Sequence, residues 1–480
     1  MRGGPLPVLL LAAFLAGCAA PADDAVVTDV VPVEPLDPLA PGPHGHRLVG
    51  FDMGLLLAED PDLVVYTYPV QVRGEATVPD GEGPFPVVLL VHGRHATCSA
   101  AGTEFVFTHV CPEAGPVEPV DSYTGYRYLA ENLASHGFVV LSISANQIND
   151  RDLAGDGGAN ARGQLVHHVL ADLVASDAGQ GSLPELASLL DLDRVGLMGH
   201  SRGGEGVVTA AQMGDGDGYH IEAVFALAPT DFAHRTFGAS VGAFAMLLPY
   251  CDGDVVGLDG ARNFDNMRLA ADRPAALHQV TAFGANHNFY NTVWTYDDGS
   301  RWSDDPWCGS ERRESDEGQR RNGTFWMASF FRHYLAGDDF LVWTQGGAPE
   351  GAGLASSYAT DQAPFAFTEA DAPALGGAEA DFCSPPACER AWTVGSASRM
   401  VFTVVDEATV ATGPVSSFRA ALSVGGPVRV LSDGQQVALL EAPRGAEAAK
   451  VVLQEHRIDA EGPLVFEGKG TVHLTDIVLR

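Results

Sequence analysis

The sequence predicts two folded parts: an α/β domain with a mostly parallel sheet covered by helices on both faces, and a C-terminal all-β sandwich of jelly-roll type. Two observations predict this. Up to about residue 370, continuous apolar runs typical of buried strands alternate with segments of helical periodicity. Beyond that point, short strand-like runs follow one another with turns between them. A chain of 480 residues also exceeds what one core usually supports.

The elements of the first part, which we place at 46–370, follow in order. The side chains of residues 66–78 alternate in character, as in strands at the antiparallel edge of a sheet. Buried strands are expected at 85–91, 138–143, from Val195, and at 221–228, 244–250 and 277–283. Helices are expected from Asp121 to Gly137, at 159–176, from Gly206 and at 325–335. Ligands of such sheets bind at the carboxyl ends of the strands.

The second part, placed at 371–480, contains six strand-like runs. They lie at 391–394, 400–405, 420–424, 428–431, 450–453 and 471–479. Their regular spacing is typical of a sandwich.

The N-terminus predicts export. Residues 1–18 combine Arg2, an apolar segment and the sequence Leu-Ala-Gly-Cys, which resembles the lipobox of bacterial lipoproteins. The resemblance implies that Cys18 is lipidated and anchors the protein in the bacterial cell envelope; an ordinary signal peptide and a secreted protein are the alternative. Six prolines at 19–45 then predict a disordered tether.

The charge of the chain excludes some partners. With 62 acidic and 28 basic residues, the net charge of -34 disfavours binding to nucleic acid and to anionic membrane surfaces. We therefore expect contact with a membrane only through the lipid anchor.

Six cysteines remain after Cys18, an even number that suggests disulfides in an exported chain. Sequence alone allows fifteen pairings. We expect neighbours to pair, Cys98 with Cys111 and Cys383 with Cys388, which leaves Cys251 with Cys308. A zinc site is disfavoured because residues 92–95 lack the His-Glu-x-x-His pattern. No metal and no cofactor are expected.

A nucleophile is predicted at Ser201. It is the centre of a Gly-x-Ser-x-Gly motif, Gly199 to Gly203, which follows an apolar run and precedes a helical pattern. Glycines on either side allow the sharp strand-to-helix turn that exposes such a hydroxyl.

Serine-based acyl transfer also needs a base, an acid and oxyanion donors. His287 follows the last apolar strand and is the expected base. Asp252 and Asp254 both lie between the serine and the histidine, in the order that this chemistry requires. The oxyanion donors are expected to be the amide of Arg202 and an amide at 93–94.

The arginines of these loops admit two interpretations. The side chain of Arg94 or Arg202 could bind a substrate carboxylate, or it could belong to a structural ion pair.

Residues 65–340 resemble the α/β-hydrolase superfamily, in the esterase and lipase branch that includes polyester hydrolases and chlorophyllases. The motif at 199–204 is similar to the serine motif of plant chlorophyllases, and His92-Gly93 to the oxyanion motif of many esterases. Residues 252–255 resemble the acid loop of polyester hydrolases, which favours Asp254 as the acid, with Asp252 as the alternative. A polar insertion at 297–319 departs from the family pattern.

The resemblance implies an exported serine hydrolase that cleaves carboxylic esters, small or polymeric, through an acyl-enzyme. A peptidase or amidase on the same fold is one alternative. Another is a non-catalytic surface lipoprotein that binds polysaccharide, since 468–479 resembles the last strand of carbohydrate-binding jelly rolls.

Overall fold

In the computed structural model, the chain from Asp37 to Arg480 forms one compact unit. The structure describes residues 36–60, 66–100, 103–108, 111, 117–152, 155–233, 241–270, 273–305, 308–344, 354–359, 365–366, 375–376, 380–383, 394, 397–410, 412–441 and 450–480. The expected signal peptide with Cys18, residues 19–35 of the expected tether, and Cys388 lie outside these ranges.

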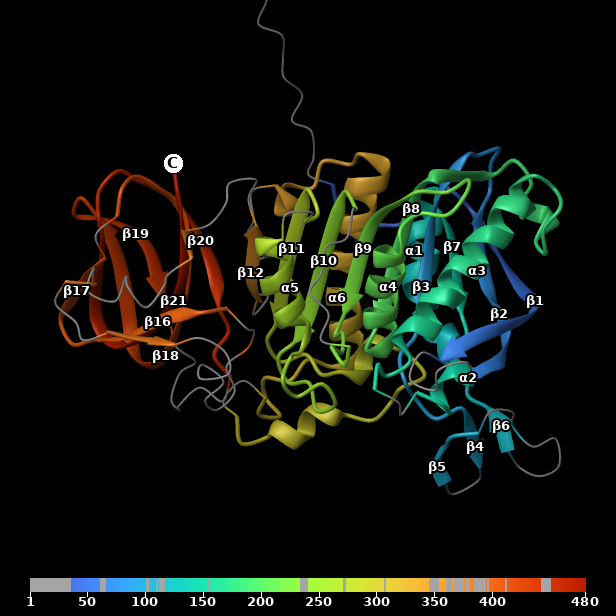
Figure 1. Ribbon diagram of the computed structural model, residues 1–480, viewed down its shortest axis with the longest axis horizontal. Coiled ribbons are helices and arrows are strands. Elements are labelled where there is room, and N and C mark those ends of the chain that lie inside the picture. Colours follow the sequence, from blue (N-terminus) through green and yellow to red (C-terminus); the bar gives the residue numbers. More distant parts are fainter. Residues whose placement is uncertain are drawn as a thin grey trace, which may run out of the picture. The chain divides into compact units, whose positions relative to one another are not determined.

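A nine-stranded mixed sheet forms the first part (Figure 1). Its spatial order is β1 (His46–Asp60), β2 (Tyr66–Pro79), β7 (Val139–Ile143), β3 (Phe85–Val91), β8 (Leu190–His200), β9 (Ile221–Leu227), β10 (Ala243–Pro249), β11 (Ala276–Ala282) and β12 (Leu354–Ala359). The six neighbouring strands β7, β3, β8, β9, β10 and β11 pair in parallel. Strands β1, β2 and β12 are antiparallel additions at the edges. The expected parallel sheet is therefore present.

Helices cover both faces of this sheet. They are α1 (Arg127–Ser135), α2 (Asn146–Asn149), α3 (Ala159–Asp177), α4 (Arg202–Met213), α5 (Gly260–Leu269) and α6 (Asp316–Phe331), with a π-helical turn at Arg332–Ala336 and short 3-10 turns at Ser122–Tyr126, Pro184–Leu186, Asn288–Tyr290, Asp298–Trp302 and Leu341–Trp343. Successive side chains of β3 point to opposite apolar clusters, as the pleat requires. One cluster is completed by α3, α4 and α5, and the other by α1 and α6.

The N-terminal edge differs from the expectation. Strand β1 was not predicted, and residues 37–45, expected to belong to the tether, lie along α1. The amide of His44 donates to the carbonyl oxygen of Ser135 at 2.9 Å. A side chain at Gly42 would come within 2.1 Å of that same oxygen, so glycine is required for this close approach.

The C-terminal part is an all-antiparallel β-sandwich with its own apolar cluster. Its strands are β13 (Phe365–Ala366), β14 (Leu375–Gly376), β15 (Ala380–Cys383), β16 (Arg399–Val404), β17 (Glu407–Val410), β18 (Val415–Ser432), β19 (Gln435–Leu440), β20 (Gln454–Ala460) and β21 (Leu464–Leu479). Two expected strands, 420–424 and 428–431, are one strand, β18, with an irregularity between them. The expected strand at 450–453 is wrong, because regular pairing starts only at Gln454. Jelly-roll connectivity stays a prediction.

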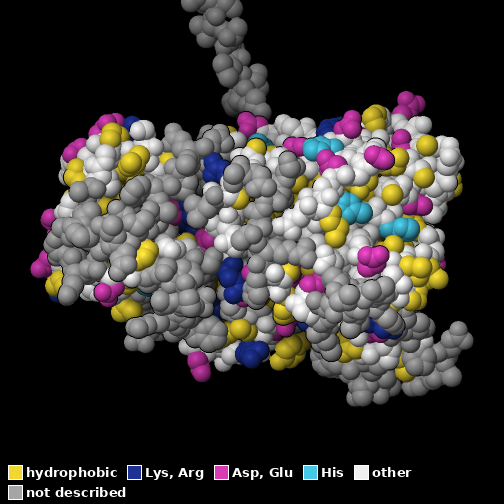
Figure 2. Space-filling model, viewed as in Figure 1, with side chains coloured by type: hydrophobic (Ala, Val, Ile, Leu, Met, Phe, Trp, Pro, Cys, Tyr) yellow, Lys and Arg dark blue, Asp and Glu magenta, His cyan; other side chains and the backbone are white. Residues whose placement is uncertain are grey.

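A small three-stranded sheet follows β3 and consists of β4 (Cys98–Ala100), β5 (Thr103–Val106) and β6 (Val117–Pro119). Within the described ranges, no helix is long and apolar enough to cross a membrane. On the face shown in Figure 2, acidic side chains are spread widely rather than gathered in one patch.

Candidate active site

Ser201 occupies a strained turn between β8 and α4. Its φ of 59° and ψ of −126° lie in a region that residues with a side chain seldom adopt. Its amide donates to the carbonyl oxygen of Leu227 at 2.8 Å, which ties the turn to the neighbouring strand. A side chain at Gly203 would come 2.3 Å from the carbonyl oxygen of Val91, so the turn depends on glycine there. This geometry is that of a nucleophile elbow.

The loop after β3 approaches the serine at Gly93. A Cβ atom at Gly93 would lie 2.4 Å from Cβ and 3.0 Å from Oγ of Ser201, so only glycine lets the two backbones come this close. His92 fixes the loop: its Nδ1 donates to the carbonyl oxygen of Gly93, and its Nε2 accepts from the amide of Ala145, both at 2.8 Å. Burial lowers the pKa of His92 to about 3, so the ring is neutral, as these two bonds require.

Arg202 directly follows Ser201 in the chain. Arg202 is the first residue of α4, where backbone amides have no acceptor within the helix. The two loops named in the sequence analysis, at Gly93 and Arg202, therefore lie beside the serine.

His287 lies in the loop after β11 and is 1% exposed. Its Nδ1 is 2.7 Å from Oδ2 of Asp252. Its Nε2 is buried and forms no hydrogen bond with any residue that the structure describes. The ring centre lies 4.8 Å from that of His200, the residue before Ser201. One nitrogen of His287 is thus fixed by a carboxylate, while the other makes no hydrogen bond with the described residues.

The acid on Nδ1 is Asp252, so the preference for Asp254 is corrected. Asp252 is fully buried, and its Oδ1 accepts the amides of Asp254 and Val255 at 2.8 and 2.6 Å. The side chain of Asp254 is 65% exposed, and its Oδ2 lies 3.7 Å from Nε2 of His287, on the other edge of the ring. The turn that Asp252 caps directs the two carboxylates to opposite sides.

The electrostatics of the two neighbouring histidines differ. Burial disfavours the cation of His287, but the carboxylates of Asp252, Asp254 and Asp298 outweigh it and raise the pKa to about 9. Burial, followed by the charge of His287, lowers the pKa of His200 well below its usual value. The carboxylates therefore act on His287 and leave His200 neutral.

The arginine side chains form a structural cluster. Asp152 is completely buried, and its Oδ1 lies 3.1 Å from Nε of Arg94 and 3.0 Å from Nη1 of Arg202. Its Oδ2 accepts from Nη2 of Arg162 at 2.7 Å. Of the two interpretations left open from sequence, the ion pair is the one that the structure contains.

Sequence reasoning missed the residues that join the acid and base loops. Oδ2 of Asp298 accepts the amides of Gly253 and His287, at 2.7 and 3.1 Å. The amide group of Gln319 binds both the N–H and the carbonyl oxygen of Asn286, at 2.8 and 2.6 Å. Both residues belong to the polar insertion at 297–319, whose composition was the available signal.

Two disulfides are present, Cys98–Cys111 and Cys251–Cys308, in the pairing expected from sequence. The second joins the residue before Asp252 to the polar insertion. The expected Cys383–Cys388 pair lies outside the described residues.

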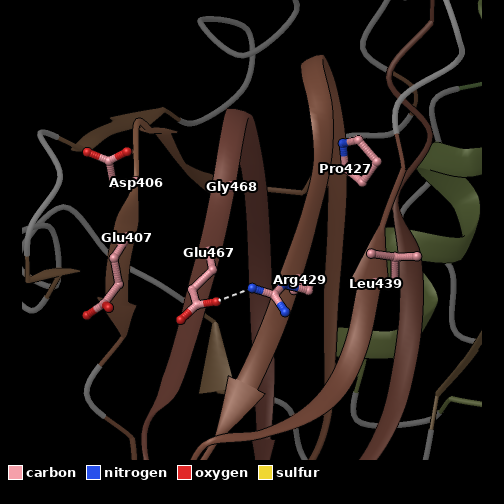
Figure 3. A pocket seen from close by; sticks show the side chains of 7 residues that line it. All are labelled: Asp406, Glu407, Pro427, Arg429, Leu439, Glu467 and Gly468. Atoms are coloured by element: carbon pink, nitrogen blue, oxygen red, sulfur yellow. Dashed lines mark hydrogen bonds and ion pairs between the residues drawn. The ribbon is translucent and has the colours of Figure 1, made fainter.

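The sandwich carries a separate open groove of about 490 Å³ (Figure 3). It is lined by Asp406, Glu407, Pro427, Arg429, Leu439, Glu467 and Gly468. Arg429 already pairs with Glu467 at 2.7 Å, as the dashed line in Figure 3 shows. Glycan binding by this domain stays a prediction.

Comparisons with known proteins point to the same chemistry. Residues 74–287 match a family model described as PET hydrolase-like. Cutinase 2 of Thermobifida cellulosilytica is 29% identical over 133 residues, which are 27% of this chain and 46% of that protein. Cutinase cut1 of Thermobifida fusca is also 29% identical, over 27% of this chain and 38% of its own length. The chain thus spans less than half the length of these relatives.

Proposed function

We propose that the protein hydrolyses carboxylic esters through an acyl-enzyme on Ser201. One observation carries the proposal: a serine in a strained elbow directly follows His200, whose ring centre lies 4.8 Å from that of a histidine whose Nδ1 is held by Asp252 and whose Nε2 has no hydrogen-bond partner among the described residues. Serine acyl transfer requires a histidine with one ring nitrogen held by an acid and the other able to take the proton of the serine hydroxyl. The likeness to cutinases adds support for an ester as the substrate.

In the proposed reaction, Oγ of Ser201 attacks the ester carbonyl carbon while Nε2 of His287 takes the hydroxyl proton. Asp252 keeps the other ring nitrogen protonated and stabilises the imidazolium. The amides of Arg202 and of the Gly93–Arg94 loop donate to the oxyanion of the tetrahedral intermediate. His287 then gives the proton to the departing alkoxide, and water attacks the acyl-enzyme by the same route.

We further propose that the protein works outside the cytoplasm. The two disulfides and the predicted signal at 1–18 support export. Lipidation of Cys18 is proposed from the lipobox alone. A polymeric ester is our preferred substrate class, on the strength of the cutinase relatives.

Hydrolysis of p-nitrophenyl esters of graded acyl length, and of a polyester film, tests the proposal. We expect wild-type activity on esters to be lost in Ser201→Ala. Ser188→Ala is the matched control, because Ser188 also has a positive φ, 60°, but lies on the surface away from the site. Equal activity of Ser201→Ala and wild type would overturn the proposal.

The same assay separates the alternatives. Faster cleavage of a p-nitroanilide than of its matched ester would indicate the peptidase or amidase. Absence of any hydrolysis, together with binding to polysaccharide, would indicate the non-catalytic lipoprotein.

A further inference from the structure

The C-terminal part reaches the acid loop with one buried lysine. Lys450 precedes β20 and is 3% exposed. Val452, two residues later, belongs to the apolar cluster of the α/β part, together with Cys251 and Cys308. Lys450 and Lys469 are the only lysines in a chain that otherwise uses arginine. Because a buried ammonium group needs compensating partners, the groups around Lys450 indicate what it stabilises.

The contacts of Lys450 are with the residues that frame Asp252. Its Nζ donates to the carbonyl oxygen of Tyr250 at 2.5 Å, two residues before the acid. The same atom lies 5.2 Å from the centre of the Tyr250 ring and 4.8 Å from that of Trp302, within cation–π range. Nε1 of Trp302 donates to the carbonyl oxygen of Asp252 at 2.7 Å. Lys450 therefore contacts the acid loop directly and also through the polar insertion.

Lys450 also supplies a positive charge where carboxylates crowd. Burial lowers the pKa of Lys450 to about 8, while the negative charges of Asp252, Asp305 and Asp298 act in the opposite direction and raise it. Burial and the charge of Asp252 raise the pKa of Asp298 to about 6, which shows that these carboxylates repel one another.

Two other polar groups around the acid loop also have partners. The hydroxyl of Tyr250 donates to Asp305 at 3.1 Å, and Nη1 of Arg301 donates to the carbonyl oxygen of Gly253 at 2.9 Å. His287 lies on the other side of Asp252 and is bound to it.

We propose that Lys450 is a positioning residue for the acid of the triad: it fixes the loop that carries Asp252 and balances the charge of that carboxylate. The β-sandwich thereby completes the active site of the preceding domain. This inference rests on the proposed function of Ser201, His287 and Asp252.

Three variants test it. Lys450→Met keeps the length of the side chain but removes the charge, and Lys450→Arg keeps the charge. Lys469→Met is the control, on an exposed lysine. We expect Lys450→Met to lower kcat for ester hydrolysis at least tenfold and to leave KM unchanged, because the ammonium lies behind the acid and not against the substrate. Lys450→Arg should restore most of kcat.

A loss of stability without a catalytic role would give a different result. Lys450→Met would then lower the midpoint of thermal unfolding, while kcat of the folded fraction would match that of Lys469→Met. That outcome overturns the inference. Absence of ester hydrolysis in the wild type overturns the proposed function instead, and this inference falls with it.

A second measurement does not require a variant of Lys450. In protein labelled with ¹³C-lysine, the two ε-methylene signals can be assigned with Lys469→Met. We expect the titration of Lys450 to move to lower pH in Asp252→Asn, because the neutral amide no longer stabilises the ammonium. An unchanged midpoint would show that Lys450 and Asp252 are not coupled.

Discussion

Asp252 and Asp254 are two residues apart, yet they lie at opposite edges of His287. Asp252 binds Nδ1 and is buried, whereas Asp254 lies 3.7 Å from Nε2 with its side chain 65% exposed. The first can fix the tautomer of the ring, and the second can only act on it through charge. This difference separates their expected mutant phenotypes.

We expect Asp252→Asn to lower kcat by about 10⁴-fold, because an amide next to Nδ1 favours the wrong tautomer of the histidine. Asp254→Asn, the matched change two residues away, should keep kcat at high pH within about tenfold of wild type. Steady-state kinetics on a soluble ester measure both. The reverse ranking would restore Asp254 as the orienting acid.

The pH profile follows from the charges around His287. The neutral ring is the base, and its pKa is raised to about 9, so kcat/KM should rise with pH through a midpoint well above 6.5. Asp254→Asn removes one of the carboxylates that raise this pKa, so the midpoint should fall by up to about one unit. Asp304→Asn, on an exposed residue, is the control. A midpoint near 6.5 in the wild type, unmoved by Asp254→Asn, contradicts this electrostatic description.

The choice between the two aspartates could not be made from sequence. The order of serine, acid and histidine allowed both, and the resemblance to polyester hydrolases favoured Asp254, whereas the structure has Asp252 on Nδ1 of His287. Only the backbone of the turn, in which Oδ1 of Asp252 accepts two amides of the following residues, determines which carboxylate points inward.

Among the elements, the polar insertion at 297–319 holds the two proposed catalytic loops together. Asp298 binds both loops through backbone amides, and Cys308 joins the insertion to Cys251. Such cross-links fix the relative position of the acid and the base, so their removal should affect activity as well as stability.

Replacing the Cys251–Cys308 pair by alanines tests this role. The disulfide closes a sequence separation of 57, for which chain entropy gives about 4 kcal/mol of stability, against about 3 kcal/mol for the separation of 13 between Cys98 and Cys111. We expect the first double variant to lose more free energy of unfolding and more kcat than the second. Denaturant unfolding and ester kinetics measure the two effects. Unchanged kcat in both variants would show that the cross-link acts on stability alone.

Strands buried on both faces were predictable, whereas edge elements were not. The apolar run at 85–91 is continuous, and β3 spans those residues. Strand β1 lies at the edge of the sheet and buries few side chains, among them those of Phe51 and Ala58. Its sequence therefore shows no clear alternation of apolar and polar residues. In the run at 450–453, the apolar residues have a different role, because Val452 belongs to the apolar cluster of the α/β part.

At the scale of the whole molecule, buried ion pairs join the two domains. Arg268 of α5 forms a bidentate pair with Asp476 of β21, with both distances 2.6 Å. Asp265 of α5 pairs with Arg419 of β18, and all four side chains are at most 7% exposed. Each of the two parts thus supplies charges that pair with buried charges of the other.

Asp476→Ala should therefore cost about 3–5 kcal/mol in free energy of unfolding, because it leaves Arg268 buried without a counter-ion. Glu467→Ala, which removes the exposed pair with Arg429, should cost at most about 1 kcal/mol. Denaturant titration of the full chain compares them. Equal, small losses would indicate that the interface between the domains is open to water.

The central claim is that His287, held by Asp252, makes the hydroxyl of Ser201 nucleophilic. The rate at which a fluorophosphonate labels the folded chain, with the adduct mapped by peptide mass spectrometry, tests it most directly. We expect a single adduct, on Ser201, formed at least a thousandfold more slowly in His287→Ala. An adduct on another residue, or equal labelling of Ser201 with and without His287, would contradict the claim.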